Sequence, residues 1–438
     1  MNRNKVLAAI DVGSSKVTTL IGQINESSEK INIIGASAIP SLGIRKGQIV
    51  NIEEATDSII RSVEAAERMA GLALSKVWVT VGGGHISSLN SHGVVAVAEP
   101  QGEIDEEDIR RVIEAARAIS LPSSREIIHA LPRTFIVDSQ EGVADPTGMC
   151  GVRLEVETHI ITASTTAMKN LTKCVSEVGA DIEGVVFSGI ASAEAVLTDT
   201  EKELGVILVD IGGGTTSVVI FIEGAPAYSS VLPIGAKNVT NDLAIGLRLS
   251  LEGAEKLKLG FSKKLYDGDE KTLEEEKSLN KTTGNKEDEI DLSKLGIHEE
   301  TKKVSQKTIV EGIIRPRLNE IFGMVAAEIQ KSGYGGLTPS GIVLTGGGAM
   351  TVGVVEACKR SLSLPVRVGI PGGITGLIDD ILEPSFSSAI GLLHYCSNET
   401  GGTVASTFSF SGLSDFTKKI PVKGMVGKIG NFIKSFLP

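Results

Sequence analysis

A glycine-rich turn in the middle of the chain has the residue types of a phosphate-binding loop. Asp210 follows the apolar run 206–209, and three consecutive glycines lead from it into two threonines. Glycines let backbone N–H groups approach a phosphate closely, hydroxyls add hydrogen bonds, and a carboxylate can hold Mg²⁺ through water. A glycine turn between two strands is also commonly structural, so this motif alone does not decide the function. The residues predicted to bind phosphate are Asp210, Gly212, Gly213, Gly214, Thr215 and Thr216.

The start of the chain contains the same order of features. The apolar run 7–10 precedes Asp11, and a short turn with glycine and hydroxyls leads to a second apolar run, 17–21. Two such strand–turn–strand hairpins indicate an internal duplication, with one hairpin in each of two related lobes that enclose a cleft. Asp11 would be the second carboxylate near Mg²⁺. The residues predicted to face phosphate here are Asp11, Gly13, Ser14, Ser15 and Lys16.

A third glycine-rich segment, 341–350, has the pattern of a buried strand followed by a triple-glycine turn and a helix. The flat base of a nucleotide can pack against bare backbone at such a turn. Glu255 and Lys258, three residues apart on a predicted helix, could reach the ribose and the base edge, although their spacing equally fits an ion pair within the helix. The residues predicted to bind adenosine are Glu255, Lys258, Gly346, Gly347, Gly348 and Met350.

The ordered set D-x-G-S-S, D-x-G-G-G-T-T and T-G-G-G-A-M resembles the phosphate-1, phosphate-2 and adenosine motifs of the actin/Hsp70/hexokinase ATPase superfamily. This resemblance implies an α/β, actin-like two-lobed fold with ATP and Mg²⁺ between the hairpins. It also implies that segment 385–392 is the second connecting helix. Segments 125–135, 148–155 and 204–216 further resemble the FtsA family of bacterial cell-division proteins, the first two matching its inserted subdomain.

The resemblance to FtsA implies a peripheral protein at the cytoplasmic face of the cell membrane, at the division site. Such a protein self-assembles into actin-like filaments, binds the C-terminal tail of the tubulin-like FtsZ and helps recruit other division proteins. The FtsZ-binding surface would include the helix 309–332. Pro316 and Arg317 match the E-P-R pattern of the family there, with Arg315 in place of its Glu, so Arg317 is the candidate contact.

One position of the second hairpin differs from the family pattern. The family usually has G-G-G-T-T-D, and here the last position is Ser217. A carboxylate near the metal or the attacking water is therefore missing. We expect at most slow ATP hydrolysis.

The chain between these motifs divides into several predicted parts. Apolar residues at helical spacing in 105–119, flanked by strand-like runs, indicate a small α+β unit. Segment 262–307 is crowded with charges of both signs and is expected to be a flexible surface insertion. The predicted domains are lobe 1 (1–82, 163–203 and 371–396), the inserted subdomain (83–162), the core of lobe 2 (204–240 and 335–370), its outer subdomain (241–334), a linker (397–421) and a C-terminal helix (422–438).

The C-terminal helix has an apolar stripe with lysines beside it, in a chain that is acidic overall. Apolar residues at steps of three and four predict a helix lying in a membrane interface, and the lysines favour anionic lipids. Docking of the stripe on another protein is the alternative. The residues predicted to bind the membrane are Met425, Ile429, Phe432, Ile433, Phe436, Lys423, Lys428 and Lys434.

Composition excludes several other classes of protein. The net charge of −11 over 438 residues argues against a general affinity for nucleic acid. The four cysteines are widely separated and the six histidines lack ligand spacing, so we expect neither a zinc site nor disulfides. We also expect no signal peptide and no membrane-spanning segment. Two relatives within the superfamily stay open as alternatives: a pilus-assembly ATP-binding protein related to FtsA, and a small-molecule kinase, for which no catalytic base is identified.

Overall fold

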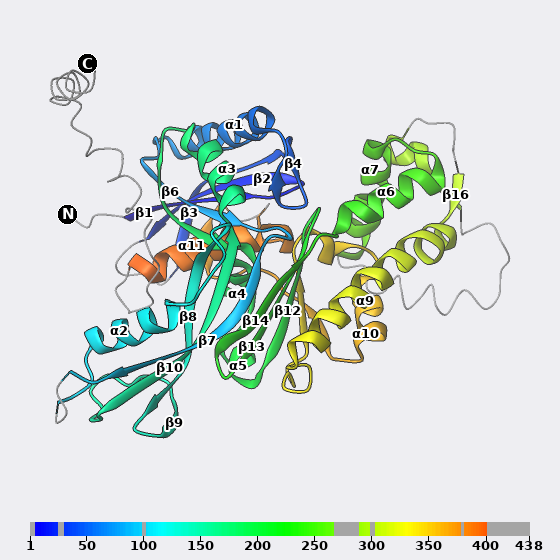
Figure 1. Cartoon of the computed structure of the whole chain (residues 1–438). Helices are drawn as coiled ribbons and strands as arrows, with labels where there is room; N and C mark the ends of the chain where they lie inside the picture. The colour runs from blue at the N-terminus through cyan, green and yellow to red at the C-terminus, as the bar shows by residue number, and fades with distance from the viewer. Residues whose placement is uncertain are drawn as a thin grey trace, which may run out of the picture.

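The computed structural model describes residues 5–24, 30–98, 102–266, 289–297, 303–377 and 381–400. Within these ranges, two β-sheets are surrounded by helices, and a smaller α+β unit extends from one end of the molecule (Figure 1). The predicted C-terminal helix and the predicted linker beyond residue 400 lie outside these ranges. No described helix is both long enough and apolar enough to span a bilayer.

The sheet of lobe 1 has six strands in the order β11-β6-β1-β2-β3-β19. The strands are β11 (Asp181–Phe187), β6 (Lys76–Val81), β1 (Lys5–Val12), β2 (Lys16–Ile24), β3 (Ile31–Pro40) and β19 (Ile374–Gly376). Helix α1 (Ile52–Ala70) packs its apolar face on β2 and β3, with Asn51 accepting a hydrogen bond from Glu54 N at its start. Helix α3 (Thr165–Ser176) lies beside α1, and the short strands β4 (Ile44–Arg45) and β5 (Gln48–Ile49) form a hairpin before α1.

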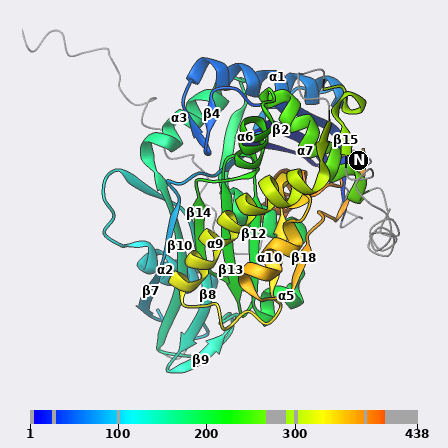
Figure 2. The same ribbon diagram turned by 90° about the vertical axis from the view of Figure 1, so that its right-hand side faces the viewer.

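The second sheet has nine strands in the order β18-β17-β12-β13-β14-β7-β10-β8-β9. Its lobe 2 strands are β18 (Val366–Val368), β17 (Ile342–Thr345), β12 (Val206–Ile211), β13 (Thr216–Ile222) and β14 (Ala225–Leu232). Helices α9 (Arg315–Ser332) and α10 (Val354–Leu362) cover one face of these strands (Figure 2). Helix α5 (Asp199–Leu204) precedes β12 and contacts β13.

The two lobes repeat one topology, as the duplicated hairpins predict. The order β11-β6-β1-β2-β3 in lobe 1 corresponds to β18-β17-β12-β13-β14 in lobe 2, with an antiparallel hairpin at the same place in each. Each turn is closed by the same hydrogen bond: Gly13 N donates to Lys16 O at 3.1 Å, and Gly212 N donates to Thr215 O at 2.8 Å. The prediction of an α/β, actin-like two-lobed fold is therefore confirmed.

Two helices lie between the sheets and join the lobes. Helices α4 (Ser188–Val196) and α11 (Ser387–Thr400) pack against each other, and α4 also contacts β12 while α11 contacts β1. Their inner residues, including Ile190 and Ile390, are buried in one core with residues of both sheets. Because α11 starts at the pocket described below, this core fixes the position of its first serines.

The inserted unit has its own core and extends the sheet of lobe 2. It consists of β7 (Ser87–Ala96), β8 (Arg125–Val137), β9 (Gln140–Val143), β10 (Arg153–Ser164) and α2 (Glu106–Arg117). The predicted helix 105–119 is present, with Asp105 as its N-cap and Asp108 completing a capping box. Strand β7 pairs with β14 at Ser87 and Ser230, a junction that sequence patterns did not predict.

The outer part of lobe 2 departs from two sequence predictions. The expected helix 309–332 begins as a π-helical stretch, Thr308–Ile314, and becomes α-helical as α9 only near Pro316, whose nitrogen has no hydrogen to donate. Part of the segment expected to be flexible is ordered, since β15 (Glu289–Asp291) pairs with β16 (Lys303–Ser305) and Leu292 is buried. Helices α6 (Ala236–Leu247) and α7 (Leu251–Tyr266) complete this part.

Candidate functional site

A pocket of about 450 Å³ lies where the three glycine-rich motifs meet. The motifs come from both lobes, so residues more than 300 positions apart in the sequence face one space. Among the residues predicted to bind nucleotide, the structure brings these to the lining: Asp11, Gly13, Ser14, Ser15, Lys16, Asp210, Gly212, Gly213, Thr215, Glu255, Lys258, Gly346, Gly347, Gly348 and Met350.

Two predicted phosphate ligands are not part of the lining. The side chain of Thr216 is fully buried, and its hydroxyl donates to Ile234 O at 2.9 Å, so it stabilises the turn after β14. Gly214 lies against Ser14 of the other hairpin, where an added Cβ would be 3.0 Å from the Ser14 Cβ. The structure thus gives both residues a role in packing the loops.

Asp11, at the end of β1, is held by its neighbouring strand. Thr80 of β6 donates its hydroxyl to Asp11 Oδ1 at 2.5 Å, and the same oxygen of Thr80 accepts from Val12 N at 3.2 Å. Burial raises the pKa of the Asp11 carboxyl, while the Thr80 hydrogen bond and the charge of Lys16 act in the opposite direction. Thr80 was missed by sequence reasoning, because a threonine at the end of a strand has no distinctive pattern.

Lys16 of the first loop is held by two residues that immediately precede α11. Its ammonium donates to Ser385 Oγ at 3.1 Å and lies 3.4 Å from the centre of the Phe386 ring. Burial lowers the pKa of Lys16 to about 8, opposed by the charges of Asp11 and Glu383. The cation is therefore positioned in the pocket by residues that follow 370 positions later in the chain.

Asp210, at the end of β12, is held by two helices. Ser192 of α4 donates to its Oδ2 at 2.6 Å, and Ser388 of α11 donates to the same oxygen at 3.2 Å. Burial raises the pKa of Asp210 to about 6, and the nearby charge of Asp11 contributes in the same direction. Gly346 is also pressed against this carboxylate, since an added Cβ would lie 2.2 Å from Asp210 Oδ1.

The two carboxylates fit a magnesium ion held mainly through water. Both line one pocket, both accept hydrogen bonds from hydroxyls, and the charge of Asp11 disfavours that of Asp210. Mg²⁺ usually keeps several waters and takes only one or two carboxylates beside phosphate oxygens. Within the described residues, no group of three or more His, Cys, Asp or Glu could form an all-protein metal cage.

At the other end of the pocket, Glu255 and Lys258 form the ion pair that their spacing allows, and their contact with ribose and base stays a prediction. Lys258 Nζ lies 2.8 Å from Glu255 Oε2, so they form an ion pair within α7. Both also bind the Thr240 hydroxyl, at 2.9 Å from Lys258 and 2.5 Å from Glu255. Both residues line the pocket, and their shared bonds to Thr240 fix the pair in place.

Ser14 of the first phosphate loop accepts two hydrogen bonds from residues outside both loops. Lys237, at the start of α6, donates its ammonium to Ser14 O at 2.7 Å, and Gly47 N donates to Ser14 Oγ at 2.8 Å. Burial lowers the pKa of Lys237, and Lys258 and Arg45 lower it further while Glu255 raises it. Sequence reasoning missed Lys237, because it lies outside the three motifs.

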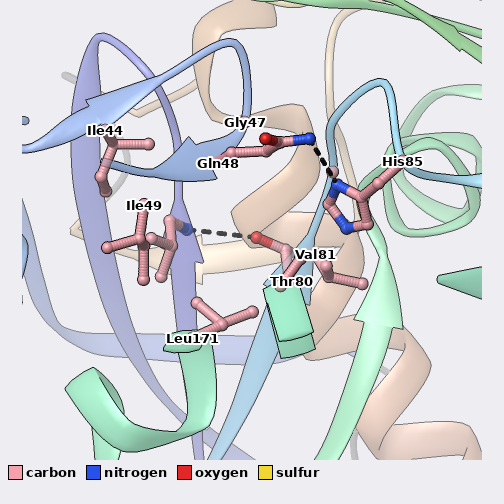
Figure 3. Close-up of a pocket in the computed structure, with 11 residues that line it drawn as sticks. Ile44, Gly47, Gln48, Ile49, Thr80, Val81, His85 and Leu171 are labelled. Carbon is pink, nitrogen blue, oxygen red and sulfur yellow. Dashed lines mark hydrogen bonds between the residues drawn. The ribbon is translucent and has the colours of Figure 1, made fainter. Parts of the chain in front are cut away.

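A much smaller chamber of about 20 Å³ lies beside this pocket and shares Val12, Gly47, Thr80 and Gly82 with its lining. Figure 3 shows its side chains, with Gln48 Nε2 3.5 Å from His85 Nδ1 and the apolar side chains of Ile44 and Leu171 also in the lining. The chamber has room for about one water molecule and none for a nucleotide.

Arg317, the candidate contact for FtsZ, is already engaged by two carboxylates. Its guanidinium donates to both oxygens of Asp242 on α6, at 2.6 and 2.9 Å, and also pairs with Glu320. Its side chain is 24% exposed. An acidic peptide would therefore have to share or displace these partners. The predicted membrane-binding residues, from Lys423 to Phe436, lie outside the described residues.

Comparison with known proteins identifies the family of this chain. A model described as "SHS2 domain inserted in FTSA" matches residues 83–162, and one described as "Cell division protein FtsA" matches residues 207–391. The cell division protein FtsA of Pseudomonas aeruginosa is 38% identical over 418 residues, covering 95% of each chain. The chain belongs to the FtsA family of cell division proteins. The resemblance drawn from the motifs is thus confirmed, including its inserted subdomain.

Solved structures support the fold alone. A PilM–PilN type IV pilus biogenesis complex contains a chain with TM-score 0.59 and 15% identity, covering 89% of this chain and 98% of that chain. MreB5 of Spiroplasma citri bound to ADP has TM-score 0.50 and 13% identity, covering 91% and 99%. These likenesses agree with an actin-like architecture in this FtsA-family protein.

Proposed function

We propose that this FtsA-family chain binds Mg-ATP between its lobes, assembles into actin-like filaments at the inner face of the cytoplasmic membrane, and tethers the FtsZ ring there. The observation that carries the proposal is the pocket in which all three glycine-rich motifs and the carboxylates of Asp11 and Asp210 meet. In this scheme, the chain also helps recruit other division proteins to the division site.

In this proposal ATP acts mainly as a ligand that closes the two lobes and favours assembly. The first loop would hold phosphate with the hydroxyls of Ser14 and Ser15 and the ammonium of Lys16, and the second with its backbone N–H groups. Ser217 lines the pocket as a buried hydroxyl at the position of the usual carboxylate, and a hydroxyl is a poor base for activating water. Steady-state phosphate release should therefore be slow, with and without lipid.

Membrane attachment is assigned to residues 422–438. Five apolar residues at helical spacing would enter the acyl boundary, while the neighbouring lysines contact anionic headgroups at about 1 kcal/mol each. One such helix binds reversibly, but a filament carries many of them, so assembly strengthens attachment. The apolar residues are Met425, Ile429, Phe432, Ile433 and Phe436.

The FtsZ tail is proposed to bind at α9 and α6, with Arg317 as its cationic contact. Asp242 and Glu320 hold the guanidinium in place and keep its pKa above its usual value. A carboxylate of the tail would bind the remaining donors of this group. Arg317→Ala should weaken FtsZ binding while ATP binding persists.

Sedimentation with liposomes tests the tether as a whole. The full chain with Mg-ATP should pellet with anionic vesicles and bring FtsZ filaments with it, whereas the Phe432→Glu variant should stay in the supernatant and bind ATP as before. Thr403→Glu, the same change to a charged side chain in the predicted linker, is the matched control and should pellet like the parent. Equal pelleting of Phe432→Glu and the parent would refute the membrane assignment.

The two alternatives predict other results in the same experiment. A pilus-assembly relative would bind ATP without needing the tail for vesicle binding or FtsZ for a partner. A small-molecule kinase would transfer phosphate rapidly once its substrate is present. Pelleting that depends on Phe432 and brings FtsZ with it favours the tether over both.

A further inference from the structure

A lysine outside the three nucleotide motifs stands at the phosphate end of the pocket. Lys237 is the second residue of α6, after the N-cap Gly235 and Ala236, and it lines the pocket. We propose that the ammonium of Lys237 binds the phosphate chain of the nucleotide, as the lobe 2 counterpart of Lys16. This inference rests on the proposed function and adds a phosphate ligand to that site.

The start of α6 is fixed directly to the second phosphate loop. Ala236 N donates to Gly212 O at 2.9 Å, and Lys237 N donates to Gly213 O at 2.8 Å. This close approach requires glycine at position 235, because an added Cβ would lie 2.5 Å from Gly212 O. A phosphate held by the loop is therefore near the first turn of α6, whatever the rest of the helix does.

The side chain of Lys237 crosses from lobe 2 toward lobe 1. Its Nζ donates to Ser14 O at 2.7 Å, so the ammonium stands between the two phosphate loops. The residue as a whole is exposed at the mouth of the pocket. An entering ligand can therefore reach the ammonium without unfolding any element.

Among the three lysines that line the pocket, Lys237 has its charge compensated least by nearby carboxylates. Lys258 forms an ion pair with Glu255 at 2.8 Å, and Lys16 has the charges of Asp11 and Glu383 near it. Lys237 has a neutral carbonyl as its hydrogen-bond acceptor, and Glu255 is the one carboxylate whose charge favours its own.

Two neighbouring cations further disfavour the charge of Lys237. Lys258 and Arg45 disfavour its charge, and only Glu255 favours it. A polyanion between the loops would compensate the charge of Lys237, whereas a neutral ligand would not. The charges thus favour a ligand with several phosphates.

A different role is a latch in which Lys237 only holds the lobes together through Ser14 O. The two roles differ in how affinity depends on the number of phosphates. If Lys237 binds phosphate, it contributes nothing to the affinity for adenosine and most to the affinity for ATP. If it is only a latch, its loss changes the affinity for every ligand that closes the lobes by the same factor.

The test is calorimetric titration of the full chain with ATP, ADP, AMP and adenosine in the presence of Mg²⁺. We expect Lys237→Gln to bind ATP about tenfold to a hundredfold more weakly than the parent, because a charge-assisted hydrogen bond is lost. ADP should lose less, and adenosine should be unaffected. Lys237→Arg should recover most of the ATP affinity.

Lys359→Gln is the matched control, since it removes the same charge from the exposed face of α10, away from the pocket lining. It should bind all four ligands like the parent, and all variants should unfold at the same temperature. If the parent binds ATP and Lys237→Gln binds it equally well, or loses the same factor for adenosine, the inference is overturned and the proposed function stands. If the parent binds no nucleotide, the proposed function and this inference both fail.

Discussion

The two glycine hairpins share a topology but hold their carboxylates in different ways. Asp11 accepts from Thr80 on the neighbouring parallel strand of its own sheet. The equivalent neighbour of Asp210 is Thr345, which pairs with it in register on β17 but bonds to Gly369 O and Ser387 Oγ instead. Asp210 depends on Ser192 and Ser388 from the two helices between the lobes.

Asp11 is held within the sheet of lobe 1, whereas the position of Asp210 depends on both lobes. Asp11 and its hydroxyl partner belong to one sheet, and the cation Lys16 lies on the adjacent strand. Asp210 is held by α4 and by α11, and α11 packs against β1 of lobe 1. A movement of the lobes relative to each other would therefore change the surroundings of Asp210 more than those of Asp11. Closure of the two lobes should therefore alter the second hairpin more than the first.

The largest effect is expected from removing the second carboxylate. Asp210→Ala should abolish Mg-ATP binding, because the variant loses its buried Mg²⁺-orienting group and leaves Ser192 and Ser388 without their acceptor. Titration of the purified chain with Mg-ATP measures this loss. Asp57→Ala on the exposed face of α1 should bind like the parent, and an unchanged affinity of Asp210→Ala would remove this residue from the site.

The same carboxylate should cost stability when neither metal nor nucleotide is present. Its folded-state pKa of about 6 lies above the usual value of 3.8, so the folded protein binds more protons between these values and becomes less stable as pH rises through that window. Asp210→Asn should therefore unfold at higher urea concentration than the parent at pH 8 in EDTA, by about 3 kcal/mol at about 1.4 kcal/mol per pKa unit. The gain should vanish near pH 4.

Asp11→Asn should stabilise the protein less than Asp210→Asn in the same urea experiment. The pKa of Asp11 is also raised by burial, but Thr80 and Lys16 oppose the shift, and the variant deprives Lys16 of a favourable charge. Its gain at pH 8 should therefore be smaller than that of Asp210→Asn. A larger gain for Asp11→Asn would reverse the comparison between the two hairpins.

A smaller effect is expected from the hydroxyls that hold the carboxylates. Ser192→Ala with Ser388→Ala leaves Asp210 without a hydrogen bond from either helix and should destabilise the protein at pH 8 by about 2 kcal/mol. Thr80→Ala should cost about 1 kcal/mol, because Asp11 keeps the charge of Lys16 nearby. Urea unfolding at pH 8 compares them, and equal losses would mean that the two carboxylates are held alike.

Much of the fold and most of the pocket lining could be predicted from sequence, because glycine turns after apolar strands are local patterns. The duplication likewise follows from two local patterns that match each other. What could not be predicted are contacts between elements far apart in the chain, such as Thr80 with Asp11 or Lys16 with Ser385. A serine or threonine that serves a buried carboxylate has the same local pattern as any other.

The junction of β7 with β14 and the π-helical start of the 308–332 helix were missed for related reasons. Strand pairing between Ser87 and Ser230 depends on which sheet edge is free, which no single segment encodes. The π-helical turn depends on the register imposed around Pro316, while the apolar spacing of the segment is compatible with an ordinary helix. Thr216 was assigned to phosphate by its position in the motif, but its hydroxyl is used by Ile234 O.

If the loops of the two lobes enclose one nucleotide, titration with Mg-ATP should distinguish the full parent chain from its Gly213→Val variant. A Cβ at position 213 would already lie 2.7 Å from the Ser15 Cβ, so valine must separate the two loops. The parent should bind one ATP saturably and Gly213→Val none, while the variant keeps the circular dichroism spectrum of the parent. Equal binding by a folded Gly213→Val variant, or no binding by the parent, would contradict enclosure of a nucleotide by the two loops.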